Sequence, residues 1–456
     1  MSAVFENALS GNARANIPLL ADEDFARVFA RDGERQISAA EFLADILALA
    51  ERLPKARYAL NLCTQRYRFL VAFCAAAVAG QTNLLPASRA PQALAEILRA
   101  YPHHYALADE DGELADTYTI DVREVLSATP AGIHFVNVSI PAKQLVAIGF
   151  TSGSTGAPKA NRKTWGGFCA SSALNLAALE SISEAFNVLA TVPPQHMFGM
   201  ELSVLLPLRS RAAIHIAQPL LPADIATALE ESPEPRILVT TPFHLRALQE
   251  SGVTLPPLAA VVTATAPLSA ELAARVEAQF STRVIELFGS TETCVIARRR
   301  TAIAAAWSLY DGVELHPQPD GTLVNAPHFL EPTLLQDIVE LLPERHFKLR
   351  GRNGDLLEIA GKRASLTDLT RRLLAIDGVE DGVIFQLDTE ADSSTERGVR
   401  RLAALVVAPS LSETQILDAL RASIDPAFLP RPLRLVAALP RNATGKLPRD
   451  ALLAAL

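Results

Sequence analysis

Short apolar segments alternate with alanine-rich helical stretches along most of the chain. This alternation covers residues 38–125 and returns from about residue 168 to 340. A helix is predicted at 269–279, because Ser269 can cap its first turn while Glu271 and Glu277 form a polar face. Apolar strands are predicted at 58–62, 145–150, 188–191, 212–216, 237–240, 259–263 and 283–287. This order of elements predicts an α/β fold with layered, mostly parallel sheets.

A different rhythm begins behind the sequence Gly-Arg-Asn-Gly-Asp at 351–355. The predicted elements there are a helix at 366–374, strands at 379–387 and 402–407, a helix at 413–423 and a proline-rich tail. Residues 389–400 are predicted to form a solvated loop between the two strands. We therefore expect a large N-terminal domain over 1–352, a hinge at 353–355 and a small α+β domain over 356–456.

Composition and charge narrow the possible functions. The 456 residues exceed what one compact core usually holds, and 49% hydrophobic against 20% charged residues is typical of globular proteins. A net charge of −8 disfavours binding to nucleic acids or anionic membranes. A small anionic substrate is still compatible with this net charge, because its binding depends on positive charge at the site itself. The apolar run 69–80 is shorter than the roughly 20 residues that a membrane span needs, so a buried helix is expected there.

The cysteines and the start of the chain indicate the cellular compartment. Cys63, Cys74, Cys169 and Cys294 are scattered and form no CxxC pair, so neither a zinc site nor a disulfide framework is expected. The first residues lack a basic region followed by an apolar stretch, which a secretory signal would have. We expect reduced thiols and a cytoplasmic location.

A loop rich in serine, threonine and glycine follows the predicted strand 145–150. Hydroxyl groups and unhindered backbone N–H groups in such a loop can surround phosphate oxygens, and a lysine at its end can neutralise phosphate charge. Its spacing is not that of a Walker A loop, so a P-loop kinase fits poorly. The candidate phosphate-binding residues are Thr151, Ser152, Gly153, Ser154, Thr155, Gly156 and Lys159.

This loop resembles the phosphate-binding signature of the adenylate-forming superfamily, which includes acyl- and aryl-CoA synthetases, peptide-synthetase adenylation domains and luciferases. Further segments match the family's motifs in the same order, and the resemblance extends from about residue 145 to the end of the chain. These segments are 286–292, 335–339, 351–352, 361–363 and 440–446.

The resemblance implies a role for several side chains around ATP. In segment 286–292, Phe288 would stack near the adenine, Thr291 would bind the α-phosphate and Glu292 would hold Mg²⁺. Asp337 and Arg352 would bind the ribose, although Leu-Gln replaces the family's Thr-Gly before this aspartate.

Three further features of the C-terminal part follow from the same resemblance. Lys446 would drive adenylation, and Gly361 would line the tunnel for the thiol after the small domain rotates. The family commonly has two acidic residues at its hinge, whereas this chain has Gly354 and Asp355.

The acid pocket is expected to draw on two segments. Segment 193–200 aligns with one pocket wall, which places His196 near the substrate carboxylate and Phe198 beside it; a core histidine on a turn is the alternative for His196. Ala264 lies in segment 263–267, at the position of the family's glycine-rich adenine-contact segment, and the usual glycines are absent there. A tighter pocket floor is therefore expected.

The resemblance implies a ligase that activates a carboxylic acid with ATP and Mg²⁺ and passes the acyl group to a thiol of CoA or a carrier protein. An aryl or medium-sized acid is expected, and the chain looks more like the compact hydroxybenzoate-type acyl carrier protein ligases of aryl-polyene pathways than like a fatty-acyl-CoA synthetase. A stand-alone amino-acid adenylation domain is one alternative, but segment 193–200 contains no acidic residue to pair an α-amino group. A catalytically silent nucleotide-binding regulator on the same fold is the other.

Overall fold

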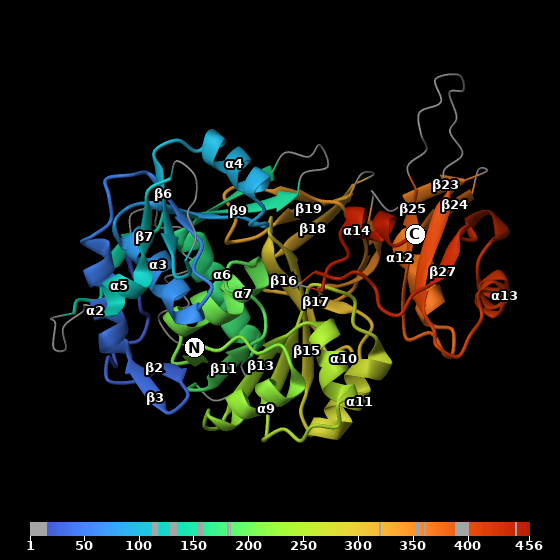
Figure 1. Cartoon of the computed structure of the whole chain (residues 1–456), viewed down its shortest axis with the longest axis horizontal. Helices are drawn as coiled ribbons and strands as arrows, with labels where there is room; N and C mark the ends of the chain where they lie inside the picture. The colour runs from blue at the N-terminus through green and yellow to red at the C-terminus, as the bar shows by residue number, and fades with distance from the viewer. Residues whose placement is uncertain are drawn as a thin grey trace. The chain divides into compact units, whose positions relative to one another are not determined.

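The structure is a computed structural model that describes residues 16–111, 117–127, 135–152, 158–179, 182, 184–318, 321–352, 356–359, 362–387, 401–442 and 445–456. The chain divides into two compact units (Figure 1). The first comprises Met1–Val313 with Asn325–Pro332, and the second comprises Glu314–Val324 with Thr333–Leu456. Each is described by itself below.

One sheet of the first unit has the strand order β10-β9-β5-β4-β6-β7. Its strands are β4 (Tyr58–Asn61), β5 (Thr82–Leu85), β6 (His104–Ala108), β7 (Thr119–Asp121), β9 (Leu145–Ser152) and β10 (Pro158–Thr164). All neighbours pair in parallel except β9 and β10, which are antiparallel. Apolar residues of this sheet pack against Leu94 and Ile97 of helix α4 (Pro91–Ala100).

Helix α3 (Arg66–Val78) is buried on nearly every side. This confirms the buried helix predicted for the apolar run 69–80, because a helix that is apolar all round must be covered on all faces. Among the described residues, no helix is long and apolar enough to cross a membrane.

A second sheet of the first unit runs in the order β17-β16-β15-β14-β13-β11-β12-β2-β3. The strands from β2 to β15 pair in parallel, and antiparallel strands follow at both sides. The bounds are β2 (Val28–Asp32), β3 (Arg35–Ser38), β11 (Asn187–Ala190), β12 (Ala213–His215), β13 (Arg236–Thr240), β14 (Ala260–Thr263), β15 (Val284–Ser290), β16 (Cys294–Arg299) and β17 (Trp307–Leu309). The predicted layered, mostly parallel α/β fold is confirmed.

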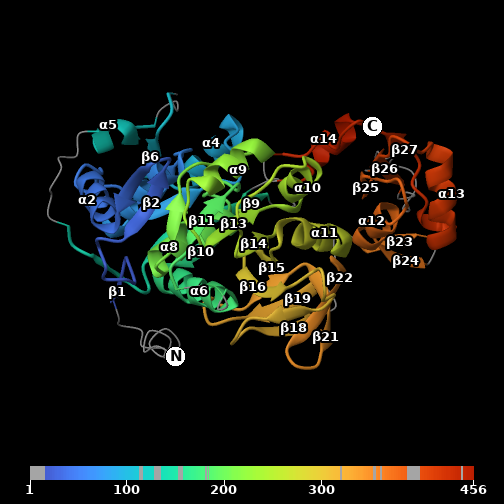
Figure 2. The same ribbon diagram turned by 90° about the horizontal axis from the view of Figure 1, so that it is seen from below.

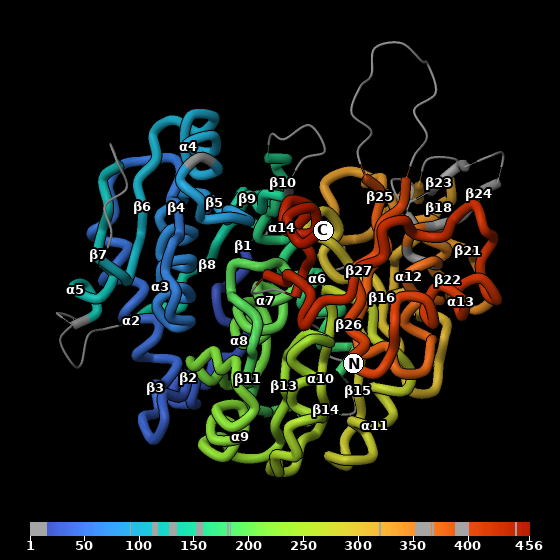
Figure 3. The backbone as a smooth tube through the Cα atoms, turned by 45° about the vertical axis from the view of Figure 1, so that its right-hand side comes forward, coloured from blue at the N-terminus to red at the C-terminus, as the bar shows by residue number. Residues whose placement is uncertain are grey.

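Three helices cover one face of this second sheet. Leu189, Leu238 and Val261 on the strands pack into one apolar cluster with the helices α9 (Pro222–Glu230), α10 (Pro242–Glu250) and α11 (Ala270–Phe280). Figure 3 shows β11, β13, β14 and β15 side by side in this part of the chain. Helix α11 begins where the sequence predicts, because the Ser269 Oγ accepts a 3.1 Å hydrogen bond from the backbone N–H of Leu272.

The first unit is completed by several shorter elements. Strands β1 (Asn16–Pro18) and β8 (Ser139–Pro141) pair with each other. The remaining helices are α2 (Ala39–Ala50), α5 (Val122–Ser127), α6 (Trp165–Ala178), α7 (Met197–Gly199), the π-helix η1 (Met200–Leu205) and α8 (Leu206–Arg209).

The second unit is built from small sheets. Its elements before residue 366 are β18 (Glu314–Gln318), β19 (Gly321–Asn325) and β20 (Thr333–Leu335), the hairpin of β21 (Asp337–Leu342) and β22 (His346–Arg352), and the hairpin of β23 (Leu356–Ile359) and β24 (Lys362–Ser365). Figure 2 shows β18, β19 and β21 grouped together. The sheet β25-β26-β27 follows, with β25 (Asp381–Gln386), β26 (Leu402–Val407) and β27 (Leu433–Leu435).

Strand β26 separates two apolar layers by its alternating side chains. Leu402, Ala404 and Val406 pack with helices α12 (Leu366–Leu374) and α13 (Glu413–Ser423) and with the 3₁₀ turn η3 (Pro426–Phe428). Ala403 and Leu405 pack on the other face with Leu452 of helix α14 (Arg449–Ala454). The predicted helices 366–374 and 413–423 are confirmed, and the predicted strand 379–387 is shorter, at Asp381–Gln386.

The domain boundary stays a prediction. The hinge residues 353–355 and the predicted loop 389–400 lie outside the described residues. The compact units group Glu314–Val324 and Thr333 onward with the C-terminal residues, whereas the boundary between the two domains was predicted at residues 353–355.

The parallel core should dominate the stability of the first unit. Leu238 on β13 is fully buried, whereas Leu221 is 64% exposed. We predict that Leu238→Ala lowers the free energy of unfolding by about 2–5 kcal/mol, because the lost contacts leave a cavity. The matched change Leu221→Ala should stay within about 0.5 kcal/mol of the parent. Equilibrium urea unfolding measures both, and equal losses would contradict this account of the core.

Candidate active site at the carboxyl ends of the strands

The parallel strands of the second sheet end at a common edge. Ala190 on β11 pairs with Val239 on β13, and Thr263 on β14 pairs with both Thr240 and Glu286. Ligands of open α/β sheets bind beyond such carboxyl ends. Three groups of predicted site residues follow these ends: His196 and Phe198 after β11, Ala264 after β14, and Phe288 to Glu292 at the end of β15.

The phosphate-loop motif and the Glu292 motif meet at this edge. Thr151, near the end of β9 in the other sheet, donates a 3.4 Å hydrogen bond from its Oγ1 to the Glu292 Oε1. Lys159 lies directly opposite Thr151 in the β9–β10 pair and is exposed. Residues Gly153, Ser154, Thr155 and Gly156 and the side chain of Ser152 lie outside the described part.

Two glycines at this edge lie in tight surroundings. A Cβ on Gly149 of β9 would lie 3.0 Å from the Thr291 Cγ2 and 3.3 Å from the Met197 Cε. A Cβ on Gly289 would lie 2.0 Å from the Cys294 carbonyl oxygen, which no side chain can tolerate. The side chains of Thr291 and Met197 therefore both lie against Gly149 of β9, whereas Gly289 packs against Cys294 of the adjacent strand β16.

Lys163 supports the Glu292 turn, and sequence reasoning missed it. Its Nζ donates a 2.7 Å hydrogen bond to the Glu292 carbonyl oxygen. The turn is also held from within, because the Ser290 N–H donates to the Thr293 Oγ1 at 3.1 Å. The Nε2 of the buried His328 lies 2.8 Å from the Thr293 carbonyl oxygen. The available signal was that lysine is rare in this chain compared with arginine. That signal does not identify the partner, because Lys163 and Glu292 are 129 residues apart in the sequence.

Phe288 has an aromatic neighbour. Its ring centroid lies 5.4 Å from that of Trp307 on β17, and the guanidinium of Arg299 on β16 lies 4.3 Å from the Trp307 ring centroid. Arg299 also forms a 2.7 Å ion pair with Glu286. The half-buried Phe288 thus stands on a supported aromatic surface at the strand edge.

Glu201 is a second residue that the sequence did not reveal. It lies on η1 and is 1% exposed. Its carboxylate accepts hydrogen bonds from the Ser171 Oγ, from the Asn175 Nδ2 at 3.1 Å and from the Val295 N–H at 2.9 Å. Burial raises the pKa of Glu201 to about 7 despite these three donors. Glu201 therefore ties the segment after β11 to the strand β16.

In the second unit, the two predicted ribose residues are direct neighbours. Asp337 and Arg352 lie opposite each other in the β21–β22 hairpin. Opposed residues in an antiparallel pair project to the same face of the sheet. Asp337 is 8% exposed, and its carbonyl oxygen accepts a 2.6 Å hydrogen bond from the Thr322 Oγ1. The Arg352 side chain lies outside the described part.

Lys446 lies on a tethered loop of the second unit. Its side chain is exposed, and its N–H donates to the Asn442 Oδ1 at 2.9 Å. Arg441 donates to the Gly445 carbonyl oxygen at 2.9 Å and forms a two-pronged ion pair with Asp381 on β25. The lysine loop is thereby fixed to the sheet β25-β26-β27. Gly354, Asp355 and Gly361 lie outside the described residues, so their roles stay predictions.

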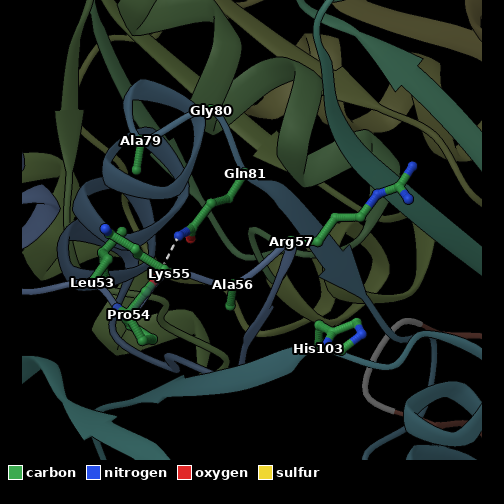
Figure 4. Close-up of a pocket in the computed structure, with 9 residues that line it drawn as sticks. All are labelled: Leu53, Pro54, Lys55, Ala56, Arg57, Ala79, Gly80, Gln81 and His103. Atoms are coloured by element: carbon green, nitrogen blue, oxygen red, sulfur yellow. Dashed lines mark hydrogen bonds between the residues drawn. The ribbon is translucent and has the colours of Figure 1, made fainter.

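A hollow of about 560 Å³ lies elsewhere in the first unit. Figure 4 shows its lining, in which Gln81 donates a 2.8 Å hydrogen bond to the Pro54 carbonyl oxygen. Arg57, Gln81 and His103 immediately precede strands β4, β5 and β6. The hollow therefore lies at the amino ends of parallel strands, the opposite edge from the one that binds ligands in open α/β sheets.

Comparison with known proteins identifies the family. Residues 23–319 match the family model described as AMP-binding enzyme. The chain belongs to the AMP-binding enzyme family. It is 28% identical to the 4-coumarate–CoA ligase of Rhodobacter capsulatus over 319 residues, which is 69% of this chain and 77% of that protein. The 4-coumarate–CoA ligase of Halorhodospira halophila is 28% identical over 312 residues, 65% of this chain and 73% of that protein.

Solved structures of other proteins have a fold similar to that of this AMP-binding enzyme. ATP-bound MatB from Rhodopseudomonas palustris has a TM-score of 0.81 at 18% identity, covering 97% of this chain and 99% of MatB. o-Succinylbenzoate CoA synthetase from Bacillus subtilis, in complex with an acyl-adenylate, has a TM-score of 0.77 at 18% identity, covering 98% of this chain and 97% of that protein.

The raised pKa of Glu201 gives a testable dependence of stability on pH in this AMP-binding enzyme. Between the ordinary value of 4.5 and about 7, the folded state holds this proton and the unfolded state does not. The parent therefore loses up to about 3 kcal/mol of stability as the pH rises through this window. Glu201→Gln has no such proton, so we predict that its stability relative to the parent rises from pH 4.5 to 7 and then levels off.

Thermal unfolding of parent and Glu201→Gln over this pH range makes the comparison. The changed hydrogen bonds of the variant shift its stability by the same amount at every pH. The test is therefore how the difference in stability between variant and parent changes with pH. Burial lowers the pKa of His328 to about 4, which gives the opposite slope in both proteins and cancels in the difference. A difference that does not change with pH would contradict the assignment.

Proposed function

We propose that this chain activates a carboxylic acid with ATP to form an acyl-adenylate, and then transfers the acyl group to a thiol. The observation that carries the proposal is the hydrogen bond between the Thr151 Oγ1 and the Glu292 Oε1. It brings a hydroxyl of the proposed phosphate loop beside a carboxylate suited to a metal–phosphate complex. Relatives that are 4-coumarate–CoA ligases support the same reaction class.

The first half-reaction joins two anions. A carboxylate oxygen attacks the α-phosphorus of ATP, the bond to the bridging oxygen breaks, and pyrophosphate leaves with the electron pair. The product is a mixed anhydride whose leaving group, AMP, is far better than oxide. Because both reactants are negative, positioning and charge screening must supply most of the rate.

The donor set at Glu292 fits a magnesium ion. Mg²⁺ is usually bound by one or two carboxylates together with substrate phosphates and water. Within the described residues, no group of three or more histidine, cysteine, aspartate or glutamate side chains could hold a metal ion without a substrate. We propose that Glu292 holds Mg²⁺, which when bound would neutralise charge on the phosphates. Lys163 keeps the Glu292 backbone in place for this role.

The other proposed contacts surround the nucleotide. Thr291 would bind the α-phosphate, Phe288 would lie against the adenine, and Lys159 with the loop at 151–156 would bind the outer phosphates. Asp337 and Arg352 would bind the two ribose hydroxyls from adjacent positions of one hairpin. His196, Phe198 and Ala264 would line the acid pocket at the strand edge.

The second half-reaction requires a different arrangement of the chain. A thiolate attacks the acyl carbon, the bond to the phosphate oxygen breaks, and AMP leaves. Lys446, poised over the α-phosphate during adenylation, would obstruct the entering thiol. We propose that the C-terminal domain rotates about a hinge at Gly354 or Asp355 and presents Gly361 to the thiol tunnel.

The acceptor thiol is proposed to belong to CoA or to a carrier protein. A basic set of Arg431, Arg434, Arg441 and Arg449 would favour an acidic carrier protein. However, Arg441 is paired with Asp381, and Arg449 donates to the Gln386 carbonyl oxygen at 3.0 Å. CoA is therefore the first acceptor to test, and the hydroxybenzoate-type carrier-protein ligases of aryl-polyene pathways remain the finer proposal with an aryl acid.

Two other functions remain open to the same assays. An amino-acid adenylation domain would need an acidic partner for the α-amino group, which segment 193–200 lacks. A silent nucleotide-binding regulator would show no acid-dependent release of pyrophosphate.

The role of Glu292 is tested by removing its charge while keeping its shape. We predict that Glu292→Gln retains the fold and slows acid-dependent pyrophosphate release by about 100-fold, with a raised requirement for Mg²⁺. The exposed Glu250→Gln serves as the matched control and should behave as the parent. If Glu292→Gln matches the parent in rate and Mg²⁺ dependence, its metal role is wrong.

The role of Lys446 is tested by separating the two half-reactions. We predict that Lys446→Ala slows acyl-adenylate formation by about 100- to 1000-fold, because a charge aimed at the reacting oxygens is lost. Given pre-formed acyl-adenylate and the thiol, the same variant should transfer the acyl group at nearly the parent rate. The exposed Lys55→Ala is the control and should affect neither step. Equal slowing of both steps would rule out the rotating domain.

A further inference from the structure

Arg66 is a buried charge in an unusual setting. It is the first residue of helix α3 and is 0% exposed. Its Nη2 donates 2.8 Å hydrogen bonds to the carbonyl oxygens of both Ala190 and Val192, and its Nη1 donates to the Ser203 Oγ. All three acceptors are neutral oxygens. They lie at the last residue of β11 and in the segment that follows it.

These acceptors bracket the loop that carries the proposed acid-pocket residues. Val192 lies immediately before residues 193–199, and Ala190 ends β11. At the other end of the loop, the Ser203 Oγ donates a 2.6 Å hydrogen bond to the Gly199 carbonyl oxygen. One guanidinium group therefore holds the entrance of the loop directly and its exit through Ser203.

The loop between these ends is tightly closed. A Cβ on Gly199 would lie 2.0 Å from the Pro193 carbonyl oxygen, so the two ends of the loop are in contact. The Met200 N–H donates to the His196 carbonyl oxygen at 2.7 Å, and the exit continues into the π-helix η1. Single π-helical turns occur often at functional sites.

Stability alone does not account for this arrangement. A buried charge costs several kcal/mol of desolvation, and replacing such a charge by an apolar residue of similar volume is often neutral or stabilising. Burial lowers the pKa of Arg66 to about 9, so the group remains charged at neutral pH. Its hydrogen bonds fix one particular path of the loop at that cost.

We propose that Arg66 is a positioning residue that sets the shape of the acid pocket, and thereby selects which carboxylic acids are adenylated. The proposal rests on the acid-activating function proposed above. Arg66 acts through the loop and does not touch the substrate. The orientation of His196 and Phe198 depends on the two ends of the loop that this guanidinium holds. ATP is proposed to bind other segments, so its affinity should not depend on Arg66.

The test is Arg66→Met, which keeps an unbranched apolar side chain at this position and removes the guanidinium that donates the three hydrogen bonds. Pyrophosphate release is measured against acid and ATP concentration over a panel of aryl and aliphatic acids. We expect the KM for the best acid to rise by roughly 10- to 100-fold, because small displacements of positioning groups are costly. The preference for that acid over its neighbours should shrink, and the KM for ATP should not change.

Arg27→Met is the matched control. Arg27 also donates to backbone carbonyl oxygens, those of Ala212 at 3.1 Å and Pro207 at 3.0 Å, but these lie at β12 and α8. Its loss should leave both KM values and the acid preference unchanged. Ser203→Ala is a milder second variant, which keeps Arg66 and releases only the exit of the loop. It should raise the acid KM in the same direction if Arg66→Met does not fold.

The outcomes separate two kinds of failure. If the parent releases no pyrophosphate with any acid, the proposed function fails. If the parent is active and both Arg66→Met and Ser203→Ala keep its acid KM and preference, the role of Arg66 is wrong. A parallel rise of the KM for acid and for ATP would also overturn it, because that pattern indicates general damage to the site. Partial recovery of acid preference in Arg66→Lys, which restores one donor group, would support it.

Discussion

The close approach of β9 and β15 is the contact on which the candidate site depends. Each strand belongs to a different sheet, and Gly149 of β9 lies tightly against the side chains of Thr291 and Met197. Thr151 therefore reaches Glu292, and Lys163 reaches the carbonyl oxygen of the same residue. A side chain at Gly149 would press against Thr291, next to the proposed metal ligand. The chemistry of two anions requires that these groups act on one small volume.

Two buried ionisable side chains, Glu201 and Arg66, connect the elements around this site. Glu201 links η1 to β16 and α6, and Arg66 links the loop before η1 to helix α3. Both groups lose hydration, which appears as a raised pKa for the acid and a lowered pKa for the base. Their hydrogen bonds define one path for the chain where apolar packing alone would allow several. The segment 190–203 is thus held from two directions by buried ionisable side chains that are not proposed to react.

Local signals in the sequence predicted much of the fold. Helix α13 was predicted over its full length, and in the structure Ser412 and Gln415 form a capping box at its start. The fold class followed from the order of strands and helices. The domain boundary remains a prediction, since it falls on residues outside the described part.

The sequence motifs predicted the candidate site residues but not the residues that hold them in position. Thr151 and Glu292 were found because they lie in recognisable segments, and the structure brings them together. Arg66, Lys163 and Glu201 were missed, because each acts on a partner distant in the sequence; Arg66 and Ala190 are 124 residues apart. Nothing local distinguishes a buried arginine at a helix start from an exposed one. The roles of all the predicted site residues, and of the hinge, remain predictions.

The most direct test of the account is detection of the acyl-adenylate itself. The parent protein is incubated with ATP, Mg²⁺ and a panel of aryl and aliphatic carboxylic acids in the absence of any thiol, and the reaction is analysed by mass spectrometry. The account predicts that an acyl-AMP appears with at least one acid and that pyrophosphate accumulates in equal amount. Adding CoA, or a carrier protein that bears a free phosphopantetheine thiol, should convert the acyl-AMP into a thioester and AMP. Binding of ATP without any acyl-AMP across the panel would contradict it.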